Sequence, residues 1–275
     1  MKKTLLLFAA SLACAANLFA ESPYGLTVCG VEVNDENKGD IMAAIITEFA
    51  EKEGVTASGT MSYNSETQTL TMNDVTINGD SYYYHLIGIT QSLTIAQTGN
   101  NELATAYGEV IYTEADLTIT GEGTLTLKHT GNENTYPTAL YCKYDNSPMH
   151  TLTIEKTNIN IEDVCGLWTS GYVQSKLVIN QSNLKVKKID TWREIELINC
   201  SIAQPSGAYM VENWASIYAN GELAQDIVIV PTETTRLQSV KTNNIGQKAY
   251  NLNGQSVKGD QKGIVLMNGQ CRFVK

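Results

Sequence analysis

The sequence predicts an all-β protein, a right-handed, single-stranded parallel β-helix of about six coils. Three observations lead to this prediction. Similar phrases begin at Leu70, Leu93, Leu117, Leu152 and Leu177, in steps of 23, 24, 35 and 25 residues. Apolar residues in each phrase alternate with Thr, Asn or Lys, which is the two-residue period of a strand. A repeat of this length can bury its apolar side only by stacking on its neighbours, as a solenoid does.

Each unit is expected to contain three short strands. In LTITGEGTLTL (117–127), apolar residues alternate with threonines on both sides of a Gly-rich turn. A third apolar segment follows each phrase, as LIGIT (86–90), VIYT (110–113), ALYC (139–142) and GLWT (166–169). Three strands and their turns fill about 23 residues at about 3.3 Å per residue. Leucine-rich repeats would need a different leucine spacing, and left-handed hexapeptide coils would need a six-residue period.

The series changes toward its C-terminal end. IELINCSI, which begins at Ile195, is a weaker copy, and IVIV (227–230) is expected to close the series. The 35-residue step contains an insertion whose protruding loops are TGNENTYP (130–137) and KYDNSPMH (143–150). Polar residues at the turns, Thr157–Asn158 and Gln181–Asn183, are expected to stack between coils through hydrogen bonds.

Three segments organise the chain. Residues 1–20 are predicted to be a signal peptide, because Lys2 and Lys3 precede a short apolar run and a cleavage site after Ala20. Residues 21–230 form the β-helix domain, including an N-terminal cap helix over residues 40–54. Residues 231–275 form a linker and a small β tail, because Asn-Gly twice separates short apolar runs there and favours hairpins. The cap helix is expected to begin at Asp40, to end at Gly54 and to place one apolar face inward: Ile41, Met42, Ile45, Ile46 and Phe49.

The N-terminal segment and the cysteines leave alternatives open. The apolar run is too short for a membrane span, and attachment as a lipoprotein through Cys14 is a second possibility. Export would permit disulfides. The five cysteines that remain after cleavage do not reveal a pairing, lack zinc-site spacing and are expected to be buried apolar residues: Cys29, Cys142, Cys165, Cys200 and Cys271.

The charge of the chain excludes some classes of partner. Cleavage after Ala20 would leave 17 basic and 29 acidic residues, a net charge of −12. Such a surface repels nucleic acid and anionic lipid. We therefore expect no nucleic-acid binding and no membrane insertion.

Two stretches near the N-terminus resemble a known family. GLTVCGVEVNDENKGDI (25–41) and GTMSYNSETQTLTMNDVTI (59–77), together with DLTITGEGTLTL (116–127), resemble secreted parallel β-helix proteins that bind carbohydrate, with cellulose and pectin binders among them. The resemblance covers roughly residues 25–203 and implies the fold and a carbohydrate ligand. Cys29 stands where that family has Gly, residues 42–57 look inserted, and the calcium-ligand cluster has no counterpart.

The C-terminal tail carries a second resemblance. YNLNGQSVKGDQKGIVLMNGQCRFVK (250–275) is similar to, but shorter than, type IX sorting tails of secreted proteins from Gram-negative anaerobes. The resemblance implies passage to the outer cell surface and contact with secretion or anchoring machinery.

Standard catalytic motifs are absent from the sequence. It contains no HExxH, GxSxG or P-loop, and GEGTLT lacks the remainder of a dinucleotide loop. His85, His129 and His150 are expected to be solvated loop residues. No cofactor or metal site is predicted.

An aromatic column is the first candidate site. Aligning the third strands places five aromatic residues one per coil, at spacings of 29, 27, 24 and 22 residues: Tyr112, Tyr141, Trp168, Trp192 and Trp214. If the apolar residue before each ring points inward, the rings point outward on coils about 4.8 Å apart. They could bind a sugar or merely stack on one another.

A basic segment is the second candidate site. In LKVKKIDTWRE (184–194), Lys185 and Lys187 are expected to face outward together, with Arg193 nearby. A polysaccharide lyase would use such residues as base and as partner of a uronate. Alternating lysines also protect sheets from aggregation.

These features predict an exported, non-catalytic protein that binds polysaccharide at the cell surface through the aromatic column. An adhesive or structural surface protein that binds a protein partner is the alternative. A polysaccharide lyase is a third possibility.

Overall fold

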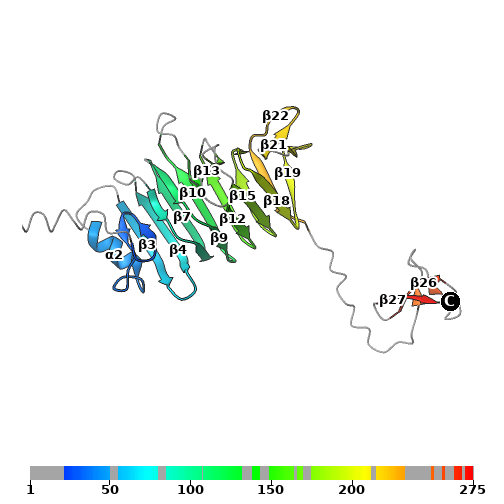
Figure 1. Cartoon of the computed structure of the whole chain (residues 1–275), viewed down its shortest axis with the longest axis horizontal. Helices are drawn as coiled ribbons and strands as arrows, with labels where there is room; N and C mark the ends of the chain where they lie inside the picture. The colour runs from blue at the N-terminus through cyan, green and yellow to red at the C-terminus, as the bar shows by residue number, and fades with distance from the viewer. Residues whose placement is uncertain are drawn as a thin grey trace, which may run out of the picture. The chain divides into compact units, whose positions relative to one another are not determined.

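The computed structural model describes residues 22–49, 55–79, 85–106, 108–131, 138–142, 149–163, 166–169, 175–211 and 215–232, and the backbone of residues 249–250, 256–257, 263–267 and 270–274. Two compact units divide the chain, residues 1–232 and residues 233–275. The first unit is a parallel β-solenoid of about four turns with one short helix (Figure 1). The predicted signal peptide lies outside the described residues.

Two long sheets build the solenoid. Sheet A has seven strands in the order β17-β14-β11-β8-β5-β1-β2. Their bounds are β1 (Leu26–Val28), β2 (Val31–Glu32), β5 (His85–Ile89), β8 (Glu109–Thr113), β11 (Leu140–Cys142), β14 (Leu167–Thr169) and β17 (Ile189–Asp190). The predicted third strands are therefore confirmed as β5, β8, β11 and β14.

Sheet B has thirteen strands and contains two columns of parallel strands. The first-strand column comprises the start of β4 (Thr69–Gly79), then β6 (Leu93–Thr98), β9 (Leu117–Thr120), β12 (His150–Glu155), β15 (Ser175–Asn180) and β18 (Glu194–Ile198). The second-strand column comprises the end of β4, then β7 (Asn100–Thr105), β10 (Thr124–His129), β13 (Asn158–Glu162) and β16 (Asn183–Val186). Beyond β16 the sheet continues with β23 (Ile227–Pro231) and then β19 (Cys200–Gln204), and β3 (Val55–Asn64) pairs with β4.

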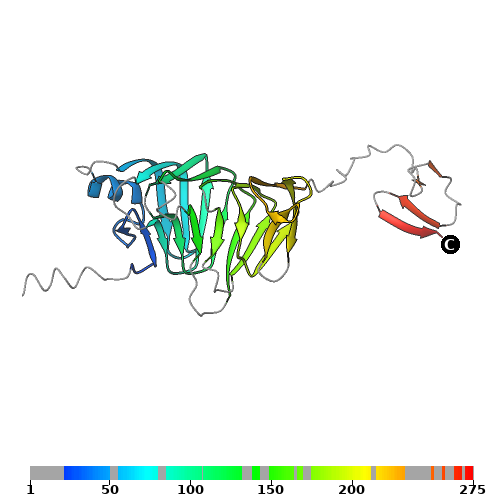
Figure 2. The ribbon, with the colours of Figure 1, turned by 90° about the horizontal axis from the view of Figure 1, so that it is seen from above.

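Each turn passes once through each column and once through sheet A. The four complete turns are β6-β7-β8, β9-β10-β11, β12-β13-β14 and β15-β16-β17. Figure 2 shows the strands of successive turns stacked along the solenoid. Leu117 lies opposite Leu152, and Leu152 lies opposite Leu177, as the repeat predicts. All three leucines are fully buried, and each such side chain stabilises the fold by about 1.5–3 kcal/mol.

The structure differs from the prediction in the register of one strand and in the direction of another. Leu70 lies opposite Ile95 rather than Leu93, so the first step is two residues longer than the spacing of leucines suggested. Ile195 lies opposite Leu177 as expected. β23, the IVIV segment, does not add a further parallel strand but runs antiparallel between β16 and β19.

A left-handed residue forms the corner between the first and second strands of most turns. Asp74, Lys156, Gln181 and Asn199 have φ between 47° and 50°, and Gly99 has φ 66°. A single residue in this conformation redirects the chain between the two columns. The predicted polar stacking at these corners is confirmed, because Asn183 Nδ2 donates to Asn158 Oδ1 at 2.8 Å and the Thr157 N–H donates to Ser182 Oγ at 3.2 Å.

The N-terminal end is covered by helix α2 (Ile41–Phe49), β1 and β2. Asp40 caps the helix as predicted, since its Oδ1 accepts from the Ala43 N–H at 3.0 Å. Ile41, Met42 and Ile45 are buried. Ile46 was assigned wrongly to the inward face, because it is 50% exposed. The side chain of Phe49, Gly54 and the loops at 132–137 and 143–148 lie outside the described residues.

The C-terminal end carries a three-stranded sheet in the order β20-β21-β22, formed by β20 (Tyr209–Val211), β21 (Ser216–Ala219) and β22 (Glu222–Leu223). The second unit is an antiparallel sheet in the order β25-β24-β26-β27. Its strands are β24 (Ala249–Tyr250), β25 (Ser256–Val257), β26 (Gly263–Met267) and β27 (Gln270–Val274). Met267 lies opposite Gln270, as the predicted hairpin at Asn268–Gly269 requires.

Candidate functional site

Three of the five predicted aromatic residues lie in one column on sheet A. Tyr112 lies opposite Tyr141, and Tyr141 lies opposite Trp168, on the adjacent strands β8, β11 and β14. The preceding residues, Ile111, Leu140 and Leu167, are fully buried. Because side chains alternate along a strand, Tyr112 and Tyr141 face outward. The side chain of Trp168 lies outside the described residues.

The rings of Tyr112 and Tyr141 do not stack face to face. Their centroids are 6.0 Å apart and their planes are tilted by 33°. Tyr112 instead stacks on the imidazole of His85, with centroids 3.9 Å apart and planes 11° apart. One face of the Tyr112 ring is therefore covered by His85.

Carboxylates surround the Tyr112 end of the column. His85 Nδ1 lies 2.6 Å from Glu109 Oε2, and the Tyr112 hydroxyl donates to Glu114. Burial, followed by the hydrogen bond to Glu114, raises the pKa of Tyr112 above its ordinary value. The phenol therefore stays protonated and keeps donating to Glu114 throughout the physiological pH range.

Trp192 does not belong to the column, contrary to the prediction. Asp190, not Trp192, lies opposite Trp168. The prediction therefore misplaced the partner of Trp168 by two residues. Trp192 is fully buried, and its Nε1 donates to the Leu167 carbonyl at 3.3 Å. Its ring therefore belongs to the core and presents no face to a ligand. Trp214 lies outside the described residues.

The predicted basic residues lie on sheet B or beside it, away from the column on sheet A. Lys185 and Lys187 alternate with buried Leu184 and Val186, so both face outward as predicted. Lys187 Nζ is 2.9 Å from Asp226 Oδ1. Lys185 and Arg193 are exposed, and neither forms an ion pair with a residue that the structure describes. The structure therefore places the basic residues and the rings on different sheets.

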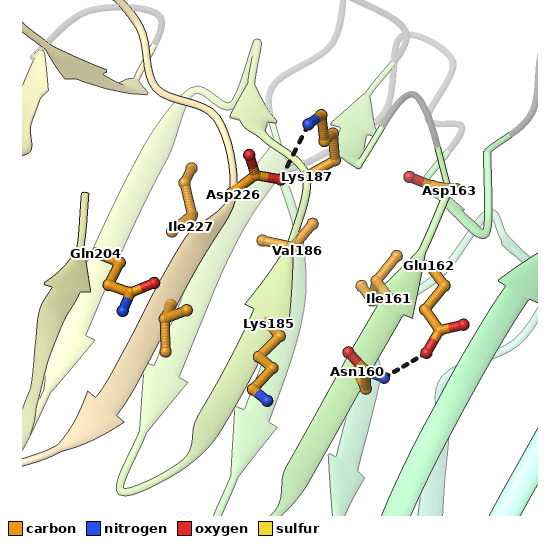
Figure 3. A pocket seen from close by; sticks show the side chains of 11 residues that line it. Asn160, Ile161, Glu162, Asp163, Lys185, Val186, Lys187, Gln204, Asp226 and Ile227 are labelled. Atoms are coloured by element: carbon orange, nitrogen blue, oxygen red, sulfur yellow. Dashed lines mark hydrogen bonds and ion pairs between the residues drawn. The ribbon is translucent and has the colours of Figure 1, made fainter.

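A groove of about 580 Å³ lies on the outer face of sheet B, around Lys185 and Lys187 (Figure 3). Residues of β13, β16, β19 and β23 and of the adjoining turns line it: Asn160, Ile161, Glu162, Asp163, Lys185, Val186, Lys187, Gln204, Asp226, Ile227 and Val228. Its volume falls within the range of small-ligand sites.

Asp163 closes one end of this groove and is held by backbone donors. The N–H groups of Ala139, at 2.6 Å, and of Gly166 donate to its two carboxylate oxygens. Burial raises the pKa of Asp163 to about 6, against the opposing effect of these hydrogen bonds and of the Lys188 charge. Asp163 therefore links two successive turns, and its pKa lies well above that of an ordinary aspartate.

Several of these groups were not anticipated from the sequence. The histidines lie on strands β5, β10 and β12 rather than on loops, because their flanking residues pair with neighbouring turns. No motif in the sequence marks Glu109 or Asp163 as a functional residue. The register His85↔Glu109 follows from correct alignment of the third strands, so the repeat itself could have revealed that pair.

The described residues show neither a cluster of three or more His, Cys, Asp or Glu side chains arranged to hold a metal ion nor a helix of the length and apolarity needed to cross a membrane. Cys29 and Cys142 are buried, as expected for apolar cysteines, and burial raises the pKa of Cys29 to about 12. Cys200 is half-buried with a free thiol.

Three comparisons with known proteins found no match to this chain. No protein-family model matches the chain. No curated protein matches it. No solved structure matches it. What is established about the chain is therefore its parallel β-solenoid.

Proposed function

We propose that this protein is an exported, non-catalytic polysaccharide-binding protein of the outer cell surface, built on a right-handed parallel β-helix of about six coils. The observation that supports this function best is the aromatic column on sheet A, in which Tyr141 lies in register between Tyr112 and Trp168. Aromatic rings pack against the C–H faces of sugars, and neighbouring rungs about 4.8 Å apart suit an extended chain better than a single sugar.

The hydrogen-bonding groups beside the column suit the same ligand. Glu114 accepts from the Tyr112 hydroxyl, and Glu109 contacts His85, which stacks on Tyr112. Both carboxylates can accept hydrogen bonds from sugar hydroxyls. At the other end, Asp190 follows Trp168 in register. An acidic border around apolar rings is compatible with a neutral glycan.

The test is retention on insoluble polysaccharides together with a glycan array. The double variant Tyr141→Ala/Trp168→Ala is expected to weaken binding by at least about tenfold, since exposed aromatic anchors dominate binding energy. Tyr209→Ala, at an exposed tyrosine on the separate sheet of β20, is the matched control and should bind normally. Equal binding by the double variant and the control would remove the column as the binding site.

Adhesion to a protein partner is the second candidate function, and strand β20 supports it. Tyr209, Met210 and Val211 are 47%, 42% and 37% exposed, and β20 is the edge strand of its sheet. Exposed apolar edge strands pair readily with strands of other proteins. Saturable binding to a protein, abolished by Met210→Glu and accompanied by no glycan binding, would favour this function over the first.

A further inference from the structure

The groove on sheet B arises where the second-strand column loses its regular pairing. On one side, β13 stays paired with β10 as far as Lys128 and Glu162. On the other side, β16 stays paired with β23 as far as Val186 and Ile227. Between β13 and β16, however, the pairing ends at Asn160 and Lys185. The two strands therefore flank a hollow on an otherwise continuous outer face.

Side chains from four adjacent strands, three of them polar, form one row along this hollow. Asn160 lies opposite Lys185, Lys185 lies opposite Val228, and Val228 lies opposite Gln204. All four side chains are half-buried or exposed. The row depends on β23, because only its insertion brings Gln204 of β19 into line with Lys185.

The two walls of the groove carry opposite charges that do not neutralise each other directly. Glu162 and Asp163 belong to the β13 side, and Lys185 and Lys187 belong to the β16 side (Figure 3). Lys187 is paired with Asp226, and Glu162 accepts from Asn160 Nδ2 at 2.7 Å. Lys185 forms no ion pair with the described residues, so its ammonium keeps donors for a ligand.

The formal charges select the class of ligand. Among the lining residues two ammonium groups face three carboxylates, and Lys128 and Lys188 act on Glu162 and Asp163 from beside the groove. The groove therefore carries no large positive excess of the kind that attracts a polyanion such as a polyuronate. A neutral sugar suits it, because each hydroxyl both donates to a carboxylate and accepts from an ammonium or amide.

We propose that this groove is a second saccharide-binding site, distinct from the aromatic column, which binds a short neutral glycan unit between the carboxylate wall of β13 and Lys185. This inference rests on the proposed function for one point, that the ligand is a polysaccharide. It does not depend on the column as the place of binding.

The test titrates the full-length protein with cellohexaose, mannohexaose and a galacturonate hexamer, using calorimetry and NMR of the side-chain amides. A neutral hexamer is expected to shift the amide signals of Asn160 and Gln204. Lys185→Met and Glu162→Gln should each weaken this binding by at least about fivefold. Lys156→Met, at an exposed lysine outside the groove, should leave it unchanged.

Combination with Tyr141→Ala separates this inference from the proposed function. If the amide shifts persist in Tyr141→Ala, the groove binds independently of the column, even when retention on insoluble polysaccharide is lost. Absence of amide shifts with both neutral hexamers would overturn the groove site, whether or not the column binds. Tighter binding of the galacturonate hexamer, or insensitivity to Lys185→Met, would overturn the assigned ligand class or contact.

Discussion

The imidazole of His85 lies nearly parallel to the ring of Tyr112, with the two centroids 3.9 Å apart, and its Nδ1 contacts Glu109. Gly88 occupies the position opposite Tyr112 on β5, so no side chain there competes with the imidazole. The aromatic column thus ends in a ring that is already covered on one face.

This stacking predicts that Tyr112 stabilises the scaffold more than it binds ligand. Tyr112→Leu should lower the free energy of unfolding by about 1–2 kcal/mol, because it removes aromatic contacts with His85 and Tyr141. Urea denaturation measures the change, with Tyr209→Leu on the exposed strand β20 as the control. A variant as stable as the wild type would contradict a stabilising role for the stack.

Trp192 gives a sharper prediction, since it is fully buried and hydrogen-bonded to Leu167. Trp192→Ala should lower the free energy of unfolding by about 3–5 kcal/mol through loss of contacts and creation of a cavity. Trp192→Phe should cost less, and glycan binding by the folded Phe variant should equal that of the wild type. Weakened glycan binding by a stable Trp192→Phe protein would show that Trp192 contributes to the binding site.

The carboxyl of Asp163 predicts a dependence of stability on pH. Burial raises its pKa from 3.8 to about 6, so the folded state holds the proton more tightly than the unfolded state. Its contribution to stability is complete below about pH 4 and is lost as the pH rises through 6, an effect on the order of 1–3 kcal/mol.

Asp163→Asn should remove this component, because the amide cannot ionise. Unfolding free energies at pH 4, 5, 6 and 7 test it, and Asp226→Asn, at an exposed carboxylate, serves as the control. The difference between wild type and Asp163→Asn should change across this range. A constant difference would show that Asp163 does not titrate there.

Substitutions at two corner residues should change the free energy of unfolding by very different amounts. Gly121 has φ 123°, and an added Cβ would lie 2.0 Å from the backbone oxygen of Gln97, so Gly121→Ala should destabilise by more than about 2 kcal/mol. Lys156 is already left-handed, and Lys156→Gly should stay within about 0.5 kcal/mol of the wild type. Thermal unfolding distinguishes the two. Equal losses in both variants would contradict a steric origin.

Much of the solenoid could be predicted because the apolar and polar residues of each repeat alternate in the sequence, as the inward and outward side chains do in the structure. Leu117, Leu152 and Leu177 lie in one buried column, as their spacing indicated. The aromatic column was predictable through Trp168 for the same reason. Beyond Trp168 the spacing failed, because turn lengths vary between coils and a shift of two residues places Asp190 in register instead of Trp192.

Features created by non-local pairing could not be predicted in the same way. The alternation in IVIV is equally compatible with parallel and antiparallel partners, so the reversed direction of β23 had no local signal. The groove and the row from Asn160 to Gln204 depend on that direction. The raised pKa of Asp163 likewise depends on burial against another turn.

The insertion of β23 also limits the length of the solenoid. β15 and β18 are direct neighbours, whereas β16 and β19 are separated by a whole strand, so the last turn opens from one strand spacing to two, from about 4.8 to about 9.6 Å. An additional coil cannot keep register with both columns across such a wedge. A single strand running backwards thus interrupts the parallel repeat at this end of the solenoid.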